Sequence, residues 1–162
     1  MSVVSPSREE LRKAPRRPAS IVGIVGLLTL LVIGALEGGL AMVTDPLEPL
    51  GMPVSYLEGA PVSDYFWPGW FLLGIAAVSL VTIAGLMLHW EWKWASGIEA
   101  VIGHRWPWLA VLSIGGVLLI FEILELFIVP FHPVMHPLLI AGSLAILLLA
   151  LTPSARRHLR KT

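Results

Sequence analysis

Three glutamates and two histidines are the residues whose types and positions in this sequence could do chemistry. Glu122 and Glu125 interrupt a long apolar run, and Glu37 stands in an earlier apolar stretch. His132 and His136 follow the run at helical spacing. Carboxylates and imidazoles gathered in apolar surroundings could bind a divalent cation or relay protons. The simpler alternative is that each side chain forms a hydrogen bond with a neighbouring helix, because charged groups in a membrane need partners.

The composition indicates an integral membrane protein. Of the 162 residues, 56 % are hydrophobic and only 14 % are charged, and the mean hydropathy is +0.81. Soluble domains are much less apolar than this. The sequence contains no cysteine. Disulfides, thiol redox chemistry and thiolate metal sites are therefore excluded.

Four apolar stretches must position the candidate residues. They predict an all-α fold, a polytopic membrane protein with a four-transmembrane-helix antiparallel bundle, because about 20 apolar residues in a helix cross a bilayer. We expect the spans at about residues 19–42, 68–89, 107–129 and 133–151. Residues 1–18 and 153–162 flank this membrane domain as basic tails.

The connection between the first two spans, residues 43–67, predicts an ordered extracytoplasmic cap. Its prolines and glycines forbid a long helix, although a helical turn over 53–57 could fold back onto the bundle. Its apolar residues are too numerous for a freely solvated loop. Asp45, Glu58, Asp64 and Tyr65 are the candidates for contact with a ligand or partner on this cap.

All eleven Lys and Arg lie in the two tails or in the loop between the second and third spans. This positive-inside pattern predicts that both termini are cytoplasmic and that the protein spans the cell (plasma) membrane several times. Glu37, Glu122 and Glu125 then lie at similar depths in the outer leaflet, where they could share an acidic cavity covered by His132 and His136. The basic tails suit anionic lipid headgroups, and nucleic acid is not an expected partner.

Small residues mark one face of the first span. Gly34, Gly38 and Ala41 share this face with Glu37. Small residues let helix backbones approach closely inside a membrane. We therefore expect Glu37 to point at another helix, and we expect Gly34→Leu to disrupt the bundle.

Part of the cap and the start of the second span form a pattern: Asp45-Pro46, Leu50-Gly51-Met52-Pro53, Leu57, Gly59-Ala60-Pro61, Asp64-Tyr65 and Pro68-Gly69-Trp70-Phe71-Leu72. The pattern resembles that of a group of small, uncharacterised four-helix integral membrane proteins of bacteria. The resemblance implies the four-helix layout and carries no activity with it.

These observations favour a non-enzymatic protein with no cofactor and no metal site. We expect an accessory subunit or a small binding module that uses the acidic cavity and the cap to contact a lipid, a cation or a partner protein. The partner could be another membrane subunit or a second copy. A proton- or cation-coupled carrier is the alternative, and a membrane-embedded metal-dependent enzyme comes third. The sequence contains no nucleophile elbow, phosphate-binding loop or HExxH motif.

Overall fold

The computed structural model describes residues 17–88, 90, 92–130 and 133–161, and helices are the regular elements of this part of the chain. The α-helices are α2 (Ala19–Thr44), α3 (Phe66–Leu88), α4 (Ser96–Ile102), α5 (Trp106–Glu125), α6 (Met135–Leu151) and α7 (Pro153–His158). Short 3₁₀ helices lie in the connections: η1 (Pro49–Gly51), η2 (Val54–Leu57) and η3 (Lys93–Ala95).

Three helices, α2, α3 and α5, are long and apolar enough to cross a membrane. They contain 26, 23 and 20 residues. A helix of about 20 residues matches the hydrocarbon thickness of a bilayer, roughly 30 Å. The apolar helix α6 is shorter, with 17 residues. By the length and composition of its helices the chain is a helical membrane protein.

The helices begin and end close to the predicted spans, with the largest difference at the end of α5. The prediction extends this span to residue 129, but the helix ends at Glu125. Turns follow, in which Phe127 N donates to Leu124 O at 3.1 Å and Ile128 N donates to Glu125 O at 2.9 Å. Pro130 keeps Val129 out of a helix, because the residue before a proline avoids the helical conformation.

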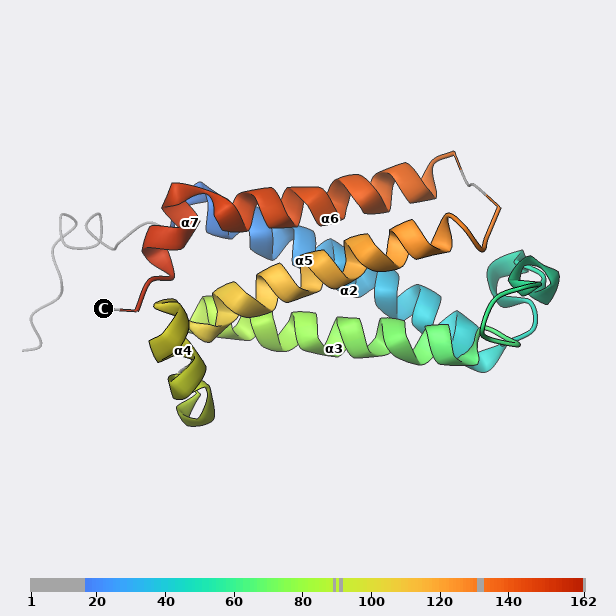
Figure 1. Cartoon of the computed structure of the whole chain (residues 1–162), viewed down its shortest axis with the longest axis horizontal. Helices are drawn as coiled ribbons and strands as arrows, with labels where there is room; N and C mark the ends of the chain where they lie inside the picture. The colour runs from blue at the N-terminus through green and yellow to red at the C-terminus, as the bar shows by residue number, and fades with distance from the viewer. Residues whose placement is uncertain (1–16, 89, 91, 131–132, 162) are drawn as a thin grey trace, which may run out of the picture.

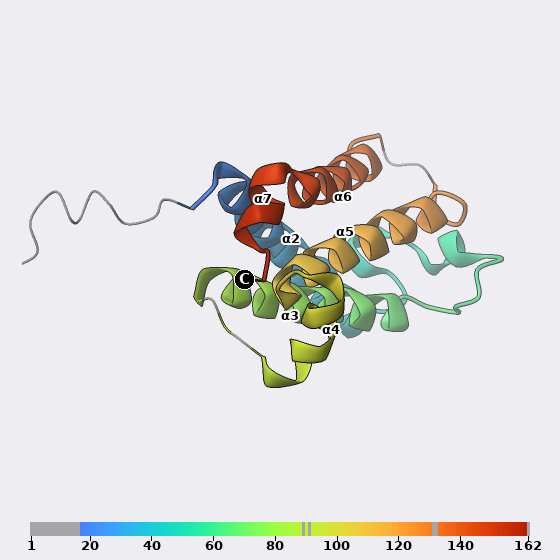
Figure 2. The ribbon, with the colours of Figure 1, turned by 60° about the vertical axis from the view of Figure 1, so that its left-hand side comes forward.

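The long helices lie side by side (Figures 1 and 2). Helix α2 packs against α3 and α6, and α5 packs against the same two helices. Each long helix therefore has two long neighbours, and the buried core lies between them. Ile21, Ile24 and Leu28 of α2 and Val111 of α5 are fully buried in this core.

The close approach of α2 to α3 occurs at a glycine pair other than the predicted one. A Cβ atom placed on Gly39 or on Gly69 would lie 3.0 Å from the carbonyl oxygen of the other glycine. A Cβ atom on Gly34 would meet nothing within 4 Å. The prediction that Gly34 faces another helix is wrong, because the buried face of α2 runs through Leu28, Val32, Ala35 and Gly39 instead.

The connection from α2 to α3 crosses one end of the bundle (Figure 1). η1 packs on α2. Leu57, at the end of η2, is 7 % exposed, and Tyr65 N donates to Pro46 O at 3.0 Å. A helical turn thus lies within the residues for which the sequence predicts one.

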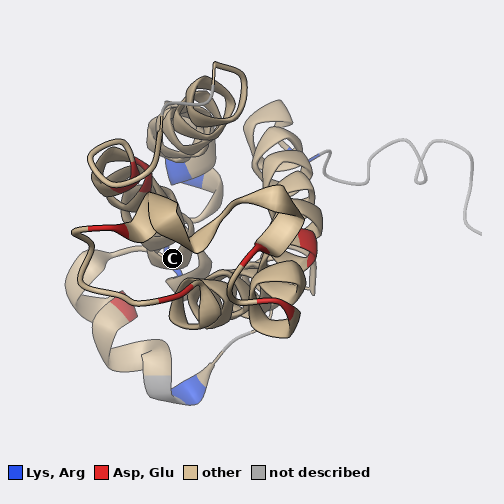
Figure 3. Ribbon diagram, turned by 90° about the vertical axis from the view of Figure 1, so that its right-hand side faces the viewer, with Lys and Arg blue, Asp and Glu red and all other residues tan. Residues whose placement is uncertain are grey.

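Charges are sorted between the two ends of the bundle. The end with the α2–α3 connection carries described acids only, and we call it the acidic end; Figure 3 looks onto it. These acids are Glu37, Asp45, Glu48, Glu58, Asp64, Glu122 and Glu125. The opposite end, with α4, α7 and the start of α2, carries the described Lys and Arg together with Glu99, and we call it the basic end.

Candidate functional site

The structure gathers four polar side chains at the acidic end, and we call them the polar cluster: Tyr65, Glu122, Glu125 and His136. Tyr65 directly precedes α3, the two glutamates lie in the last turn of α5, and His136 lies in the first turn of α6. Since α5 packs along α6, the short connection between them returns His136 to the end of α5.

An aromatic contact fixes the α5 side of the polar cluster. Phe121, which precedes Glu122, stacks on Phe71 of α3 with ring centroids 4.8 Å apart and an interplanar angle of 24°. Stacked aromatic pairs contribute beyond their buried area. Glu122 is therefore held at a defined position between the helices.

Burial is the main physical property of the polar cluster. Glu122 is 4 % exposed and His136 is 5 % exposed, whereas Glu125 is half-buried. Among the described residues, Oε2 of Glu122 has no hydrogen-bond partner. Glu125 and His136 are close enough for their charges to interact. A buried carboxylate without a cation costs several kcal/mol, so Glu122 suits a bound proton or a small cation.

Tyr65 joins the polar cluster to the α2–α3 connection. It is 3 % exposed, and its hydroxyl donates to Pro53 O at 3.4 Å. Burial raises the pKa of Tyr65 above its usual value, and the charges of Glu125 and Tyr56 raise it further. The tyrosine therefore stays a neutral hydrogen-bond donor at the edge of the polar cluster.

Glu37 is not part of the polar cluster. Its side chain is exposed on α2, so the expectation that it points at another helix of this chain is wrong. The cause is rotation about the helix axis, because Ala35 and Gly39 are buried and Glu37 lies on the opposite face. A cavity shared by Glu37, Glu122 and Glu125 therefore does not form within the described residues.

The remaining predicted residues have local roles or lie outside the described part of the chain. Asp64 Oδ1 accepts from Phe66 N at 3.0 Å at the start of α3. Asp45 Oδ1 accepts from Glu48 N at 3.3 Å, and Glu58 is exposed. His132 lies outside the described residues.

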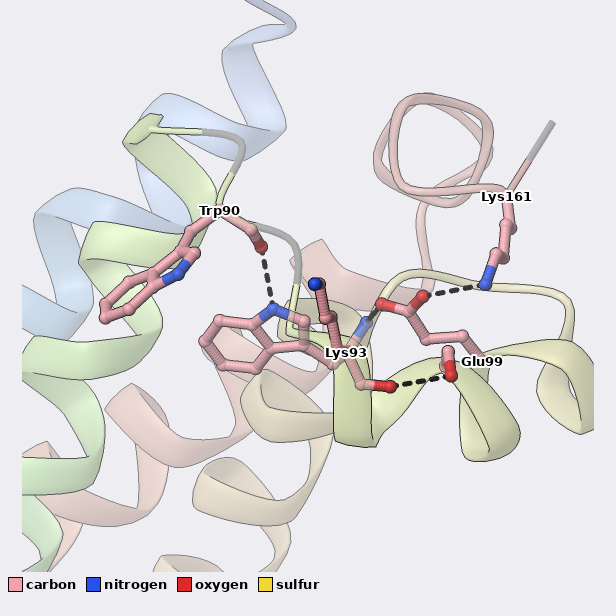
Figure 4. Close-up of polar contacts among 6 residues, drawn as sticks. Trp90, Lys93, Glu99 and Lys161 are labelled. Atoms are coloured by element: carbon pink, nitrogen blue, oxygen red, sulfur yellow. Dashed lines mark hydrogen bonds and ion pairs between the residues drawn. The ribbon is translucent and has the colours of Figure 1, made fainter.

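Sequence reasoning did not find the buried acid of the basic end. Glu99 in α4 is 7 % exposed; its Oε1 accepts from Trp106 N at 2.9 Å and its Oε2 from Lys161 Nζ at 3.0 Å (Figure 4). Trp106 Nε1 in turn donates to Trp90 O at 2.9 Å. In the sequence, Glu99 stands out only as an acid in the loop that carries Lys93 and Arg105. Lys161 is too distant along the chain to be predicted as its partner.

Within the described ranges, no three His, Asp or Glu side chains are arranged to hold a metal ion. No protein-family model, curated protein or solved structure matches this chain.

Proposed function

We propose that this chain is a non-enzymatic accessory subunit of a membrane protein assembly. It spans the plasma membrane four times with both termini in the cytoplasm, and the outer half of α2 contacts a transmembrane helix of another protein. The sorted charges support this orientation, because Lys and Arg favour the cytoplasmic side. The 17 residues of α6 support a fourth span, since about 17 to 25 residues suffice.

The proposal rests on the exposure of Glu37 on the surface of α2. Glu37 lies seven residues before the helix ends at Thr44, which is about 10 Å at 1.5 Å per residue. In the proposed orientation this places a carboxyl group on the outer surface of the bundle at membrane depth. Ionisable side chains at this depth almost always contact protein or water rather than lipid. A partner helix would supply that contact.

The surroundings of Glu37 suit a helix. Ile33 and Leu40 are 59 % and 54 % exposed. Gly34 lies beside them with open space around its Cα, since a Cβ placed there meets nothing within 4 Å. A glycine on an exposed membrane face allows close approach of another backbone. The face has both an apolar surface and a position for close helix contact.

The charge of Glu37 specifies the kind of partner. We expect a helix of a different protein that carries Lys, Arg or another hydrogen-bond donor at this depth. A second copy in the same orientation is disfavoured, because the Lys and Arg that the structure describes lie toward the other end of the bundle and acid would meet acid.

Site-specific photocrosslinking in native membranes tests the proposal. A crosslinker at Leu40 should give one discrete adduct with a membrane protein, and Glu37→Leu should abolish it. The adduct should return when Glu37→Lys is combined with a basic-to-acidic change at the crosslinked partner position. Ile120 of α5, which is 61 % exposed, is the matched control position.

Each alternative has its own outcome in this experiment. An adduct with the mass of two copies would show that this face binds a second copy of the chain and not the proposed partner. Equal adducts from Leu40 and Ile120, or adducts that survive Glu37→Leu, would contradict the proposal. Gly34→Leu should remove the adduct without unfolding the protein. Gly39→Leu should unfold it, because the added side chain would overlap Leu73 and the Gly69 backbone.

A proton- or cation-coupled carrier is the second candidate. The observation in its favour is Glu122, which is buried in α5 with one carboxyl oxygen unpartnered among the described residues. Glu125 and His136 beside it could exchange protons with it. The carrier uses the polar cluster and the subunit uses Glu37, so substitutions separate the two functions.

A further inference from the structure

The basic end contains a cavity of about 480 Å³ between α7 and the junction of α4 with α5. Ile102 and Pro153 contribute to its apolar wall, and His104, Arg156, Arg157 and Arg160 contribute polar side chains. We call it the basic pocket. Cavities of roughly 300 to 1,000 Å³ hold small ligands, so the basic pocket has room for a phosphate group and its substituents.

The walls of the basic pocket are fixed by contacts between distant parts of the chain. Arg105 N donates to Leu159 O at 2.7 Å, and Lys161 N donates to Gly103 O at 3.1 Å. The ion pair of Lys161 with Glu99 adds a side-chain link at 3.0 Å (Figure 4). The C-terminal segment is thus attached to the start of α5, and the basic pocket is formed before a ligand binds.

The start of α7 is also fixed by contacts. Thr152 is its N-cap residue, and Thr152 Oγ1 accepts from Ala155 N at 3.3 Å. Ala155 is fully buried, and α7 packs on α6 and α2. The C-terminal segment, for which the sequence predicts a basic tail, therefore contains a helix that holds Arg156 and Arg157 at defined positions.

Arginine determines the chemistry of the basic pocket. None of the described residues that line it is acidic, and the nearby acid Glu99 is bound by Lys161 and by the Trp106 backbone. Arg156, Arg157 and Arg160 have no acidic partner in the described ranges. Planar guanidinium groups bind phosphate oxygens in a bidentate manner. The pocket is suited to a phosphate-bearing anion.

The position of the basic pocket points to a lipid. It lies where α6 ends and α5 begins, beside Trp108, whose Nε1 donates to Ala150 O at 3.0 Å and whose ring stacks on His104. Tryptophan is enriched at the level of lipid headgroups. Basic pockets between membrane helices on the cytoplasmic side bind anionic headgroups.

We infer that the basic pocket binds the phosphate group of an anionic phospholipid through Arg156, Arg157 and Arg160, with the acyl chains lying along the bundle. This site is distinct from the α2 face of the proposed function, because it lies at the opposite end of the molecule. Loss of lipid binding would leave the partner contact of Glu37 unaffected, and the reverse also holds.

Native mass spectrometry of the full chain tests the inference with phosphatidylglycerol and phosphatidylcholine of identical acyl chains. We expect tighter binding of phosphatidylglycerol. Combined Gln substitutions at Arg156, Arg157 and Arg160 should weaken it at least about tenfold. Gln substitutions at Arg8, Arg12 and Lys13 remove the same charge from the N-terminal tail, and they should change it less than about threefold.

Two further variants keep the test decisive. If the triple variant does not fold, the single substitution Arg160→Gln takes its place. The Arg160→Gln variant should still show a lower preference for phosphatidylglycerol than the parent. Arg157→Lys retains the charge but not the guanidinium geometry, so it should also weaken binding. Equal losses in the pocket and tail variants would overturn the inference, because the effect would then be general charge attraction.

Inorganic phosphate distinguishes the source of the anion. In phosphatidylcholine nanodiscs, millimolar phosphate should give no saturable binding, because it lacks the acyl chains that hold a lipid at the site. Saturable phosphate binding that the Arg160→Gln variant loses would show a soluble phosphate ligand and would overturn the lipid assignment. The absence of any preference for phosphatidylglycerol would overturn it as well.

Discussion

The two ends of the molecule hold their buried glutamates in opposite ways. At the basic end, Glu99 is 7 % exposed and accepts hydrogen bonds from Trp106 N and Lys161 Nζ. At the acidic end, Glu122 is 4 % exposed, and its Oε2 has no partner among the described residues. The same residue type is thus paired with donors at one end of the bundle and has an unpartnered oxygen among the described residues at the other.

The local environment of Glu99 explains its role. Burial by itself raises the pKa of this carboxyl group, but the hydrogen bond from Trp106 N opposes burial. The hydrogen bond and charge of Lys161 and the charge of Arg105 act in the same direction as Trp106, and the net pKa lies below 4.5. Glu99 is therefore an ionised structural residue that attaches the C-terminal segment to α5.

Among substitutions at the buried glutamates of the two ends, removal of the Glu99 side chain should have the largest effect on stability. We expect Glu99→Ala to lower the free energy of unfolding by about 2 kcal/mol, because hydrogen bonds to charged groups contribute about 1.5 to 3 kcal/mol. Chemical unfolding in detergent measures the change. Glu58→Ala, at an exposed acid of the connection, is the control and should stay within about 0.5 kcal/mol of the parent. An equal change in the free energy of unfolding for Glu99→Ala and Glu58→Ala would show that Glu99 stabilises the protein no more than an exposed acid does.

Acid should weaken the basic end selectively. The pKa of Glu99 is lower in the folded protein than the unperturbed value of 4.5. Its contribution to stability is therefore fully present above pH 4.5 and is lost as the pH falls through the folded pKa. The stability difference between the parent and Glu99→Gln should be constant near neutrality and should shrink below pH 4.5. A difference that persists at lower pH would contradict the assignment of Glu99 as an ionised partner.

Glu122→Gln should have the smallest effect on stability, within about 0.5 kcal/mol. Glutamine has the shape and donor of a neutral carboxylic acid, which is the form expected for a buried carboxyl without a cation. The variant should lose an infrared carboxyl-stretch band at pH 7 that Glu125→Gln retains. If the polar cluster serves a carrier, Glu122→Gln should also abolish proton or cation flux in proteoliposomes. A stability loss as large as that of Glu99→Ala would instead mean that Glu122 is ionised and paired.

The sequence by itself determined that the protein is helical and membrane-embedded, and which way the charges are sorted. Apolar runs of sufficient length predict α2, α3 and α5 to within a few residues, because backbone groups in lipid must be paired within a helix. The prolines and glycines of residues 43–67 likewise predict a connection without a long helix ahead of α3. Glu122 and Glu125 are candidates because acids are conspicuous in an apolar run, and His136 is a candidate because of its helical spacing from His132.

Only the tertiary structure decided which faces of these helices meet. Lipid is as apolar as the interior of the bundle. Apolar side chains therefore lie on all sides of α2, and their spacing along the sequence does not indicate which side is buried. The small-residue pattern therefore predicts that Glu37 and Gly34 face the interior, whereas in the structure both are exposed and Gly39 makes the close contact with α3. The pairing of Glu99 with Lys161 and the arginines of the basic pocket depend on contacts between segments far apart in the chain. A local sequence pattern does not predict these contacts, because they arise from the packing of α7 against the bundle.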